Sequence, residues 1–169
     1  FSKSNIESIE IPRHVKRIEE GTFNSCFHLK TVKFTEDSEL QSIEKDAFLD
    51  STIESINIPS NFESFQNCWC KSVKYLTQIK ISPKNRNFLY LNDQFIVGKS
   101  DSNNDFFDNL IFSRRDIKKV TIPSFIKKIS AYSFENCKLL QAVKMDPNSE
   151  TNVHKNAFFK CKFSNIYNI

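Results

Sequence analysis

The feature that most constrains this 169-residue chain is an internal repeat. Apolar anchor residues recur along it at Ile9, Val32, Ile56, Ile79, Val120, Val143 and Ile166. Successive anchors are separated by 23, 24, 23, 41, 23 and 23 residues, so one interval breaks the period. Self-similarity at a fixed period is typical of repeat architectures, in which each unit buries its apolar face against the next. The chain is therefore predicted to fold as a solenoid.

The length of the repeat predicts which solenoid forms. A period of about 20 to 29 residues with an apolar L-x-x-L-x-L core is typical of leucine-rich repeats, whereas helical repeats run longer. The alternation in Val32-Lys33-Phe34 and Ile56-Asn57-Ile58 indicates a half-buried strand. We predict a β-dominated leucine-rich-repeat solenoid, with a parallel β-sheet on its concave face and short strands and 3₁₀ or helical turns on its convex side.

The repeat pattern also carries a family resemblance. Copies approximate I-P-x-x-[VI]-x-x-I-x-x-x-[AST]-F-x-x-C-x-x-L-x-x-[VI], and the cleanest runs from Ile122 to Val143. This pattern resembles the BspA-like leucine-rich repeats of surface proteins in oral bacteria and parasitic protists. The resemblance covers nearly the whole chain and implies a non-catalytic recognition module, but the family offers no fixed binding residues to transfer. The repeat at 62–81 departs most, with Cys70 at the core phenylalanine position, or Trp69 filling that space from one position away.

We expect one domain over residues 1–169, made of about seven repeats of about 23 residues with an insertion at about 85–116. The chain begins with Phe1 and both of its ends fall inside repeats, so we interpret it as a fragment. Solenoids need polar caps. Apolar ends would therefore favour end-to-end self-association.

The insertion carries its own strand signals. Phe88–Leu91 and Phe95–Val97 bracket Asn92-Asp93, a turn signal, and predict a hairpin. Leu110–Phe112 is a plausible third strand. We interpret the insertion as a structural spacer, and a protruding contact loop is the alternative.

Composition excludes several function classes. Glycine occurs only twice, which excludes glycine-rich phosphate loops and dinucleotide fingerprints. The net charge of +4 falls short of the dense basic surface of a nucleic-acid-binding protein. No apolar run approaches the roughly 20 residues of a membrane-spanning helix. We therefore expect neither nucleic acid as a partner nor a membrane-spanning segment in this chain.

Cysteine and histidine positions predict no chemistry. Cys26, Cys137 and Cys161 share one column of the repeat, where we expect them to be buried as small hydrophobic side chains. A disulfide between Cys137 and Cys161, in adjacent repeats, is the alternative. Cys68-Trp69-Cys70 lacks the second ligand pair of a zinc site. The three histidines fall at different points of the repeat, at His14, His28 and His154. We predict no catalytic residue, no metal and no cofactor.

The remaining candidates lie on the surface. The residues that flank the anchors on the predicted concave face are the candidate binding residues, namely Lys33, Asn57, Lys80, Lys119, Thr121, Lys144 and Tyr167. A basic patch beside the insertion, which could meet sulfated glycans or acidic proteins, comprises Arg114, Arg115, Lys118, Lys119, Lys127 and Lys128. A merely solvated face is the alternative for both sets.

The predicted partner is a protein or glycan, and the resemblance implies a location at the cell surface or outside the cell. The alternative is a cytoplasmic scaffold for protein–protein interaction. Unpaired thiols and the absence of an N-x-S/T glycosylation sequence favour that alternative, because secreted proteins usually pair their cysteines.

Overall fold

The computed structural model describes residues 1–101, 103, 105–162 and, as backbone, 166–168. In these residues it holds strands β1 to β15 and no helix. The chain divides into two compact units, Phe1–Asn87 (unit 1) and Phe88–Ile169 (unit 2). Each unit is described by itself, and the expectation of one domain over the whole chain stays a prediction.

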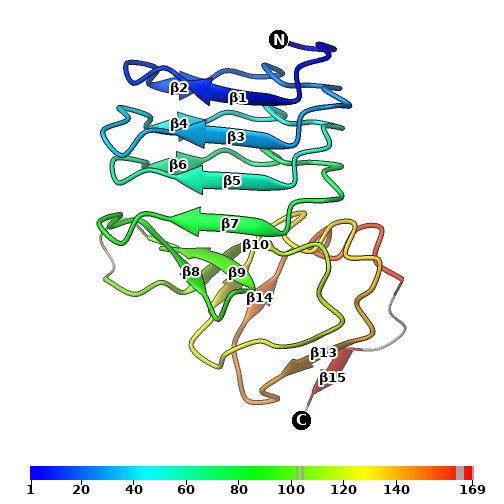
Figure 1. Ribbon diagram of the computed structural model, residues 1–169. Helices are drawn as coiled ribbons and strands as arrows, with labels where there is room; N and C mark the ends of the chain where they lie inside the picture. Colours follow the sequence, from blue (N-terminus) through cyan, green and yellow to red (C-terminus); the bar gives the residue numbers. More distant parts are fainter. Residues whose placement is uncertain (102, 104, 163–165, 169) are drawn as a thin grey trace. The chain divides into compact units, whose positions relative to one another are not determined.

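Unit 1 is a stack of coils in which long and short strands alternate along the chain, from β1 to β7 (Figure 1). The long strands form a four-stranded parallel sheet in the order β1 (Ser8–Ile11), β3 (Thr31–Phe34), β5 (Ser55–Ile58) and β7 (Gln78–Ile81). The short strands form a second parallel sheet in the order β2 (Arg17–Ile18), β4 (Ser42–Ile43) and β6 (Ser64–Phe65). Ile9 pairs with Val32, Val32 with Ile56, and Ile56 with Ile79. The predicted anchor column is therefore the pairing register of the sheet.

Unit 2 repeats this arrangement around the insertion. Its long strands are β11 (Lys119–Thr121), β13 (Ala142–Met145) and β15 (Ile166–Asn168), again parallel. Its short strands are β12 (Lys128–Ile129) and β14 (Asn152–Val153). The sheet of each unit that carries its long strands is called the long-strand sheet below.

The predicted hairpin in the insertion is confirmed. Strands β8 (Phe88–Leu91) and β9 (Phe95–Gly98) pair antiparallel, and β10 (Asn109–Ser113) is the third strand. Because β10 also pairs in parallel with β12, the insertion extends the short-strand sheet of unit 2. Gly98 is required there, since an added Cβ would lie 2.8 Å from both Ile111 and the Phe88 ring.

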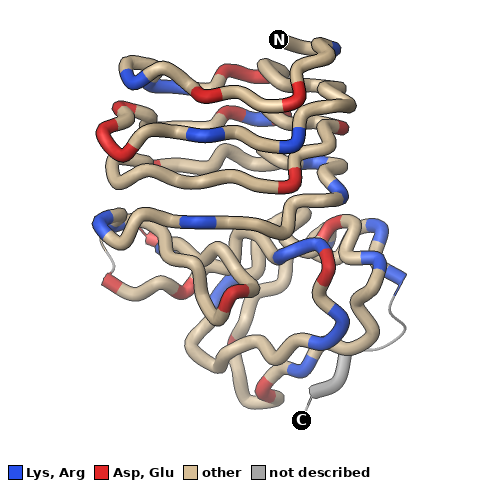
Figure 2. Tube along the Cα trace, viewed as in Figure 1, with Lys and Arg blue, Asp and Glu red and all other residues tan. Residues whose placement is uncertain are grey.

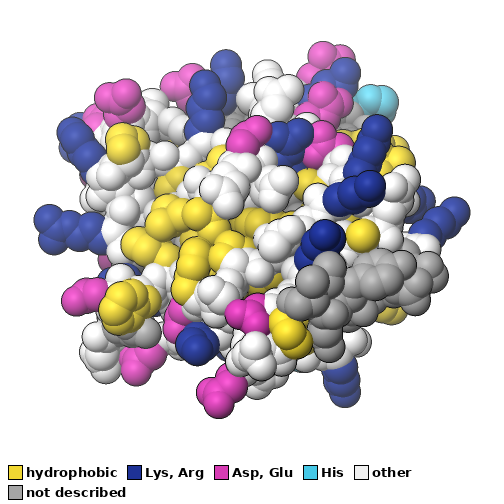
Figure 3. Space-filling model, turned by 90° about the horizontal axis from the view of Figure 1, so that it is seen from below, with side chains coloured by type: hydrophobic (Ala, Val, Ile, Leu, Met, Phe, Trp, Pro, Cys, Tyr) yellow, Lys and Arg dark blue, Asp and Glu magenta, His cyan; other side chains and the backbone are white. Residues whose placement is uncertain are grey.

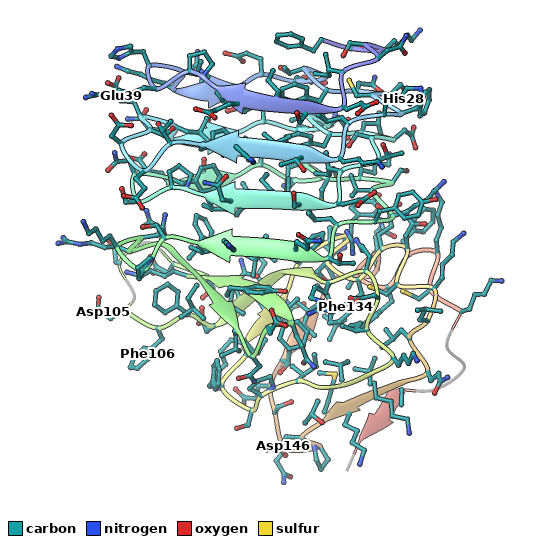
Figure 4. All side chains as sticks on the ribbon, in the orientation of Figure 1. His28, Glu39, Asp105, Phe106, Phe134 and Asp146 are labelled. Atoms are coloured by element: carbon teal, nitrogen blue, oxygen red, sulfur yellow. The ribbon has the colours of Figure 1, made fainter. Side chains whose placement is uncertain are left out.

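The cores of both units contain rows of aromatic rings. Phe23 stacks on Phe48 with ring centroids 5.2 Å apart, and Phe134 (labelled in Figure 4) stacks on Phe158 at 4.7 Å. The departing repeat is filled by Trp69, which is 3% exposed and meets Phe48 edge-on at 6.2 Å. Trp69 therefore fills the space of the missing phenylalanine from one position away, which was one of the two alternatives predicted from the sequence.

The turns that were predicted to be 3₁₀ or helical are single turns, and none extends into a helix in the described residues. The Phe-x-x-Cys segments keep the i to i+3 hydrogen bond of a 3₁₀ turn, as from Cys26 N to Phe23 O at 3.4 Å. Left-handed residues, with φ between 55° and 66°, lie two positions after the phenylalanine position at Ser25, Asp50, Ser72, Asn136 and Lys160. Others lie two positions before it, at Gly21, Asp46, Cys68 and Tyr132. These corners interrupt the right-handed backbone that a helix needs, so the chain turns sharply instead.

The corner at Gly21 gives a direct test of this backbone requirement. A Cβ added there would meet nothing closer than Asn24 Cβ at 3.9 Å, so space is available and only the φ of +66° opposes a side chain. We expect Gly21→Ala to lower the free energy of unfolding by roughly 1 kcal/mol in chemical denaturation. Gly21→Asn is the matched control and should lose less, because asparagine tolerates the left-handed region. An alanine variant as stable as the parent chain would contradict this account.

Candidate functional site

The outward side chains of the long-strand sheet in unit 1 do not all remain available to a ligand. Glu10 lies beside Lys33, and Asn57 beside Lys80, in the strand register. Lys33 and Lys80 are exposed. Asn57 is half-buried, and its amide donates to Phe34 O at 2.7 Å while its carbonyl accepts from Phe34 N at 2.9 Å. Among the candidates Lys33, Asn57 and Lys80, Asn57 therefore uses its side-chain amide to join β3 to β5.

In unit 2 the candidate residues lie on neighbouring strands. Thr121 of β11 pairs with Lys144 of β13, and both are exposed, as is Lys119. Because adjacent strands lie about 4.8 Å apart, Thr121 and Lys144 are neighbours on one face. Tyr167 follows Lys144 in the backbone register, but its side chain lies outside the described residues.

Lys119, Thr121 and Lys144 line a hollow that the sequence did not predict. It has a volume of about 400 Å³ and is formed by β11 and β13 on one side and by Asn92 and Gln94 on the other. Asn92 and Gln94 both lie in the turn between β8 and β9. The insertion therefore contributes to the candidate site. A second hollow of about 250 Å³ shares Asn92, Gln94 and Lys119 with the first. Their combined lining is called the β11 hollow below.

The turn at the edge of the β11 hollow is held by Arg114. Its guanidinium contacts the Asp93 carboxylate at 2.7 Å and the Asp116 carboxylate at 2.7 Å. The hydrogen bond from Arg114 holds the pKa of Asp116 below its usual value and raises the pKa of Arg114. Asn92 and Asp93 both have left-handed backbone, as expected of a tight hairpin turn. Arg114 thus fixes the shape of the hollow while its own charge is balanced.

The lysines supply the remaining charge of the β11 hollow. Lys118 and Lys119 line it together with Lys144, and all three are exposed. Within the described part of the chain, none of the three forms an ion pair with a carboxylate. The hollow therefore has a net positive lining, suited to an anionic group.

The predicted basic patch does not form one surface. Arg115 is only 3% exposed, donates to Ser133 O at 2.9 Å and lies 4.2 Å from the centre of the Phe112 ring. It is a core residue, because the cation–π contact and the hydrogen bond compensate a buried guanidinium, and the expectation that it is exposed was wrong. Lys127 and Lys128 are exposed at the start of β12, on the short-strand sheet. The charges of the chain are marked in Figure 2.

The cysteine column is buried as predicted at two of its three positions. Cys26 and Cys137 are 0% exposed, and Cys161 is half-buried. Each thiol donates to a carbonyl about one coil away, as from Cys26 to Phe1 O at 3.1 Å and from Cys161 to Phe134 O at 2.9 Å. Burial raises the pKa of Cys137 and raises that of Cys161 to about 12. The three thiols are free, so the alternative of a disulfide between Cys137 and Cys161 is not realised.

The three histidines of the described chain are exposed. Among the described residues, no group of three or more His, Cys, Asp or Glu side chains is placed to hold a metal ion. His14 makes an exposed contact of 2.9 Å with Glu39, while His28 is exposed and Cys26, two positions before it, is buried. Nor do the described residues contain a helix with the length and apolar character to cross a membrane.

Some hydrophobic side chains of unit 2 are only partly buried. Figure 3 shows hydrophobic side chains gathered near the centre of the face seen from below. The half-buried hydrophobic residues packed against the core of unit 2 are Leu89, Leu91, Phe107, Met145, Val153, Phe158 and Cys161. Self-association of the chain stays a prediction.

Comparison with known proteins identifies the repeat. The profile of the BspA type leucine rich repeat region matches residues 1–95 and 102–168, in six copies. No curated protein matches the sequence.

Solved structures share the fold. A leucine-rich cell surface protein of Faecalibacterium prausnitzii has a TM-score of 0.74, 21% identity and a match over 88% of this chain. The pneumococcal vaccine antigen PcpA has a TM-score of 0.82, 19% identity and a match over 98%. A leucine-rich repeat protein of Eubacterium ventriosum has a TM-score of 0.60, 19% identity and a match over 93%. The chain spans 37%, 41% and 52% of these three proteins, and at such identities the likeness establishes the fold alone.

The buried thiols predict a labelling pattern. Native chain treated with iodoacetamide at pH 8 should remain unmodified at Cys26 and Cys137, because alkylation needs an accessible thiolate and these thiols are buried. The same peptides should be fully modified after unfolding in guanidinium chloride, as measured by mass spectrometry. Labelling of Cys137 in the folded chain at the rate of the unfolded chain would refute the buried column.

Proposed function

Because the chain belongs to the BspA-type leucine-rich-repeat family, we propose that it is a non-catalytic recognition module that binds a protein or glycan in cell-surface adhesion or host interaction. The observation that carries this proposal is the β11 hollow. There the predicted residues Lys119, Thr121 and Lys144 lie together beside the turn of the insertion. The ligand group that fits such a lining is anionic, such as a carboxylate or a sulfate.

The architecture supports a binding role. Long-strand sheets of solenoids present columns of side chains on one continuous face, which is the usual binding surface of repeat proteins. In unit 2 this face is hollowed and carries lysines without an ion-pair partner among the described residues. Lysine charges on a rim raise association rates and favour anionic partners.

The surface location rests on the similar proteins. Two of the structures that share the fold are described as a cell surface protein and as a vaccine antigen. Their likeness to this chain supports the same location for it.

An intracellular scaffold for protein–protein interaction is the second candidate. The observation that favours it is the free state of Cys26, Cys137 and Cys161. Secreted proteins usually pair their cysteines, whereas cytosolic proteins keep them reduced.

The lysines of the β11 hollow provide the first test. Heparin and poly-glutamate, each immobilised, serve as anionic glycan and anionic protein probes, and dextran serves as the neutral one. We expect at least one anionic probe to bind, with an affinity that falls as salt is added. The double variant Lys119→Ala/Lys144→Ala should bind about five- to thirtyfold more weakly, since each exposed charge pair is worth about 0.5–1 kcal/mol.

The matched control is Lys127→Ala/Lys128→Ala. It removes the same charge from the short-strand sheet of the same unit, so a general electrostatic effect would weaken both double variants equally. Equal loss in both variants, or no binding to either anionic probe, would refute the β11 hollow as the site.

The location is tested by antibody staining of cells of the source organism. Staining of intact, unpermeabilised cells is expected if the chain acts at the surface. Staining that requires permeabilisation would contradict the adhesion role and support the intracellular scaffold.

A further inference from the structure

Three neighbouring loops of unit 1 differ in length. They lead from the turns at the phenylalanine position into the long strands and run over Cys26–Leu29, Ser51–Ile53 and Val73–Leu76. Leu29 follows Cys26 by three positions and Leu76 follows Val73 by three, but Ile53 follows Ser51 by two. The middle loop is therefore one residue shorter than the loops on either side. The first of the three contains His28, labelled in Figure 4.

The short loop, Ser51–Ile53, is hydrogen-bonded to the loop before it, Cys26–Leu29. Thr52 donates from its backbone N to Cys26 O at 3.4 Å and from its hydroxyl to Leu29 O at 3.2 Å. The two longer loops project beyond it and leave a hollow of about 190 Å³. This hollow is called the notch below, and its lining residues are Phe27, Asp50, Ser51, Thr52, Ser72, Lys74 and Tyr75.

An exposed aromatic ring lies on each flank of the notch. Phe27 is 62% exposed and Tyr75 is 54% exposed, whereas Phe23, Phe48 and Phe62 of the same unit are fully buried. Their loops belong to coils two steps apart, and each step of a parallel sheet is about 4.8 Å, so the two loops lie about 10 Å apart. Phe27 and Tyr75 therefore approach the notch from loops on either side of the short one.

The base of the notch carries polar groups. Ser51 is only 3% exposed, and its hydroxyl has no hydrogen-bond partner among the described residues. A buried hydroxyl without a partner is costly, and a ligand that bonds to it removes that cost. Asp50 and Lys74 add an exposed carboxylate and an exposed ammonium group to the rim. The notch thus combines apolar flanks with donors and acceptors at its base and rim.

We propose that the notch binds one hexopyranose unit of a glycan. A pyranose ring has apolar C–H faces that pack on the negative faces of aromatic rings. Its edge carries hydroxyl groups that both donate and accept, which matches a carboxylate, an ammonium group and a serine hydroxyl. The notch lies in unit 1 and uses none of the lysines of the β11 hollow, so this site does not depend on the proposed function of unit 2.

The test is a titration of the ¹⁵N-labelled chain followed by NMR. The probes are the methyl glycosides of glucose, galactose, mannose and N-acetylglucosamine. At least one of them is expected to cause saturable shifts of the amides of Ser51, Thr52 and Lys74. Phe27→Ala should weaken that binding roughly two- to tenfold, the range expected for loss of one aromatic contact, and Phe27→Tyr should retain it.

Two further variants separate binding from stability. Ser51→Ala should weaken binding without lowering the free energy of unfolding, because the hydroxyl it removes has no partner in the described chain. Leu139→Ala removes another exposed apolar side chain, in unit 2, and should leave the affinity unchanged. Absence of saturable shifts at the notch with all four glycosides would overturn the proposal, as would a Phe27→Ala variant that binds like the parent chain.

Discussion

Hydrogen bonding between successive coils at a fixed register is the constraint on which the rest of each unit depends. Once Ile9 pairs with Val32, and Ile56 with Ile79, the strand residues of a coil lie over their counterparts in the coil before. The strand register alone then places Phe23 over Phe48, where the two rings stack. Left-handed corners recur beside each phenylalanine position. A parallel sheet alone can do this, because its strands run in one direction and the same point of every repeat returns to the same edge.

The same constraint explains how surface hollows arise. Because neighbouring coils cannot shift to follow a local change, a coil that gains or loses residues leaves a step at the surface. The insertion of unit 2 adds a hairpin whose turn stands beside β11 and encloses a hollow with Lys119 and Lys144. In unit 1 a loop shorter by one residue leaves the notch between Phe27 and Tyr75. Both candidate sites thus lie at departures from the repeat.

Residue type and column position are not enough to identify a binding residue. Asn57 occupies the outward column of a long strand, yet both ends of its side-chain amide are bonded to the backbone of Phe34. Arg115 lies in a run of basic residues, yet it is buried against Phe112. In both cases the contacts of the side chain, and not its place in the repeat, decide whether a ligand can reach it. A polar group that finds partners inside the protein is removed from the surface.

The sequence by itself determined the repeat, its period, the seven long strands, the hairpin of the insertion and the burial of Cys26 and Cys137. These follow from the spacing of apolar residues, and burial of apolar surface is the dominant force in folding. Only the tertiary structure decided that the turns are not helical, that Arg115 is a core residue and that the turn of the insertion meets Lys119. These features depend on backbone angles and on contacts between residues far apart in the chain, as with Arg114 and Asp93. Spacing along a sequence fixes which residues share a face, but the distance between two loops is set only when the coils have stacked.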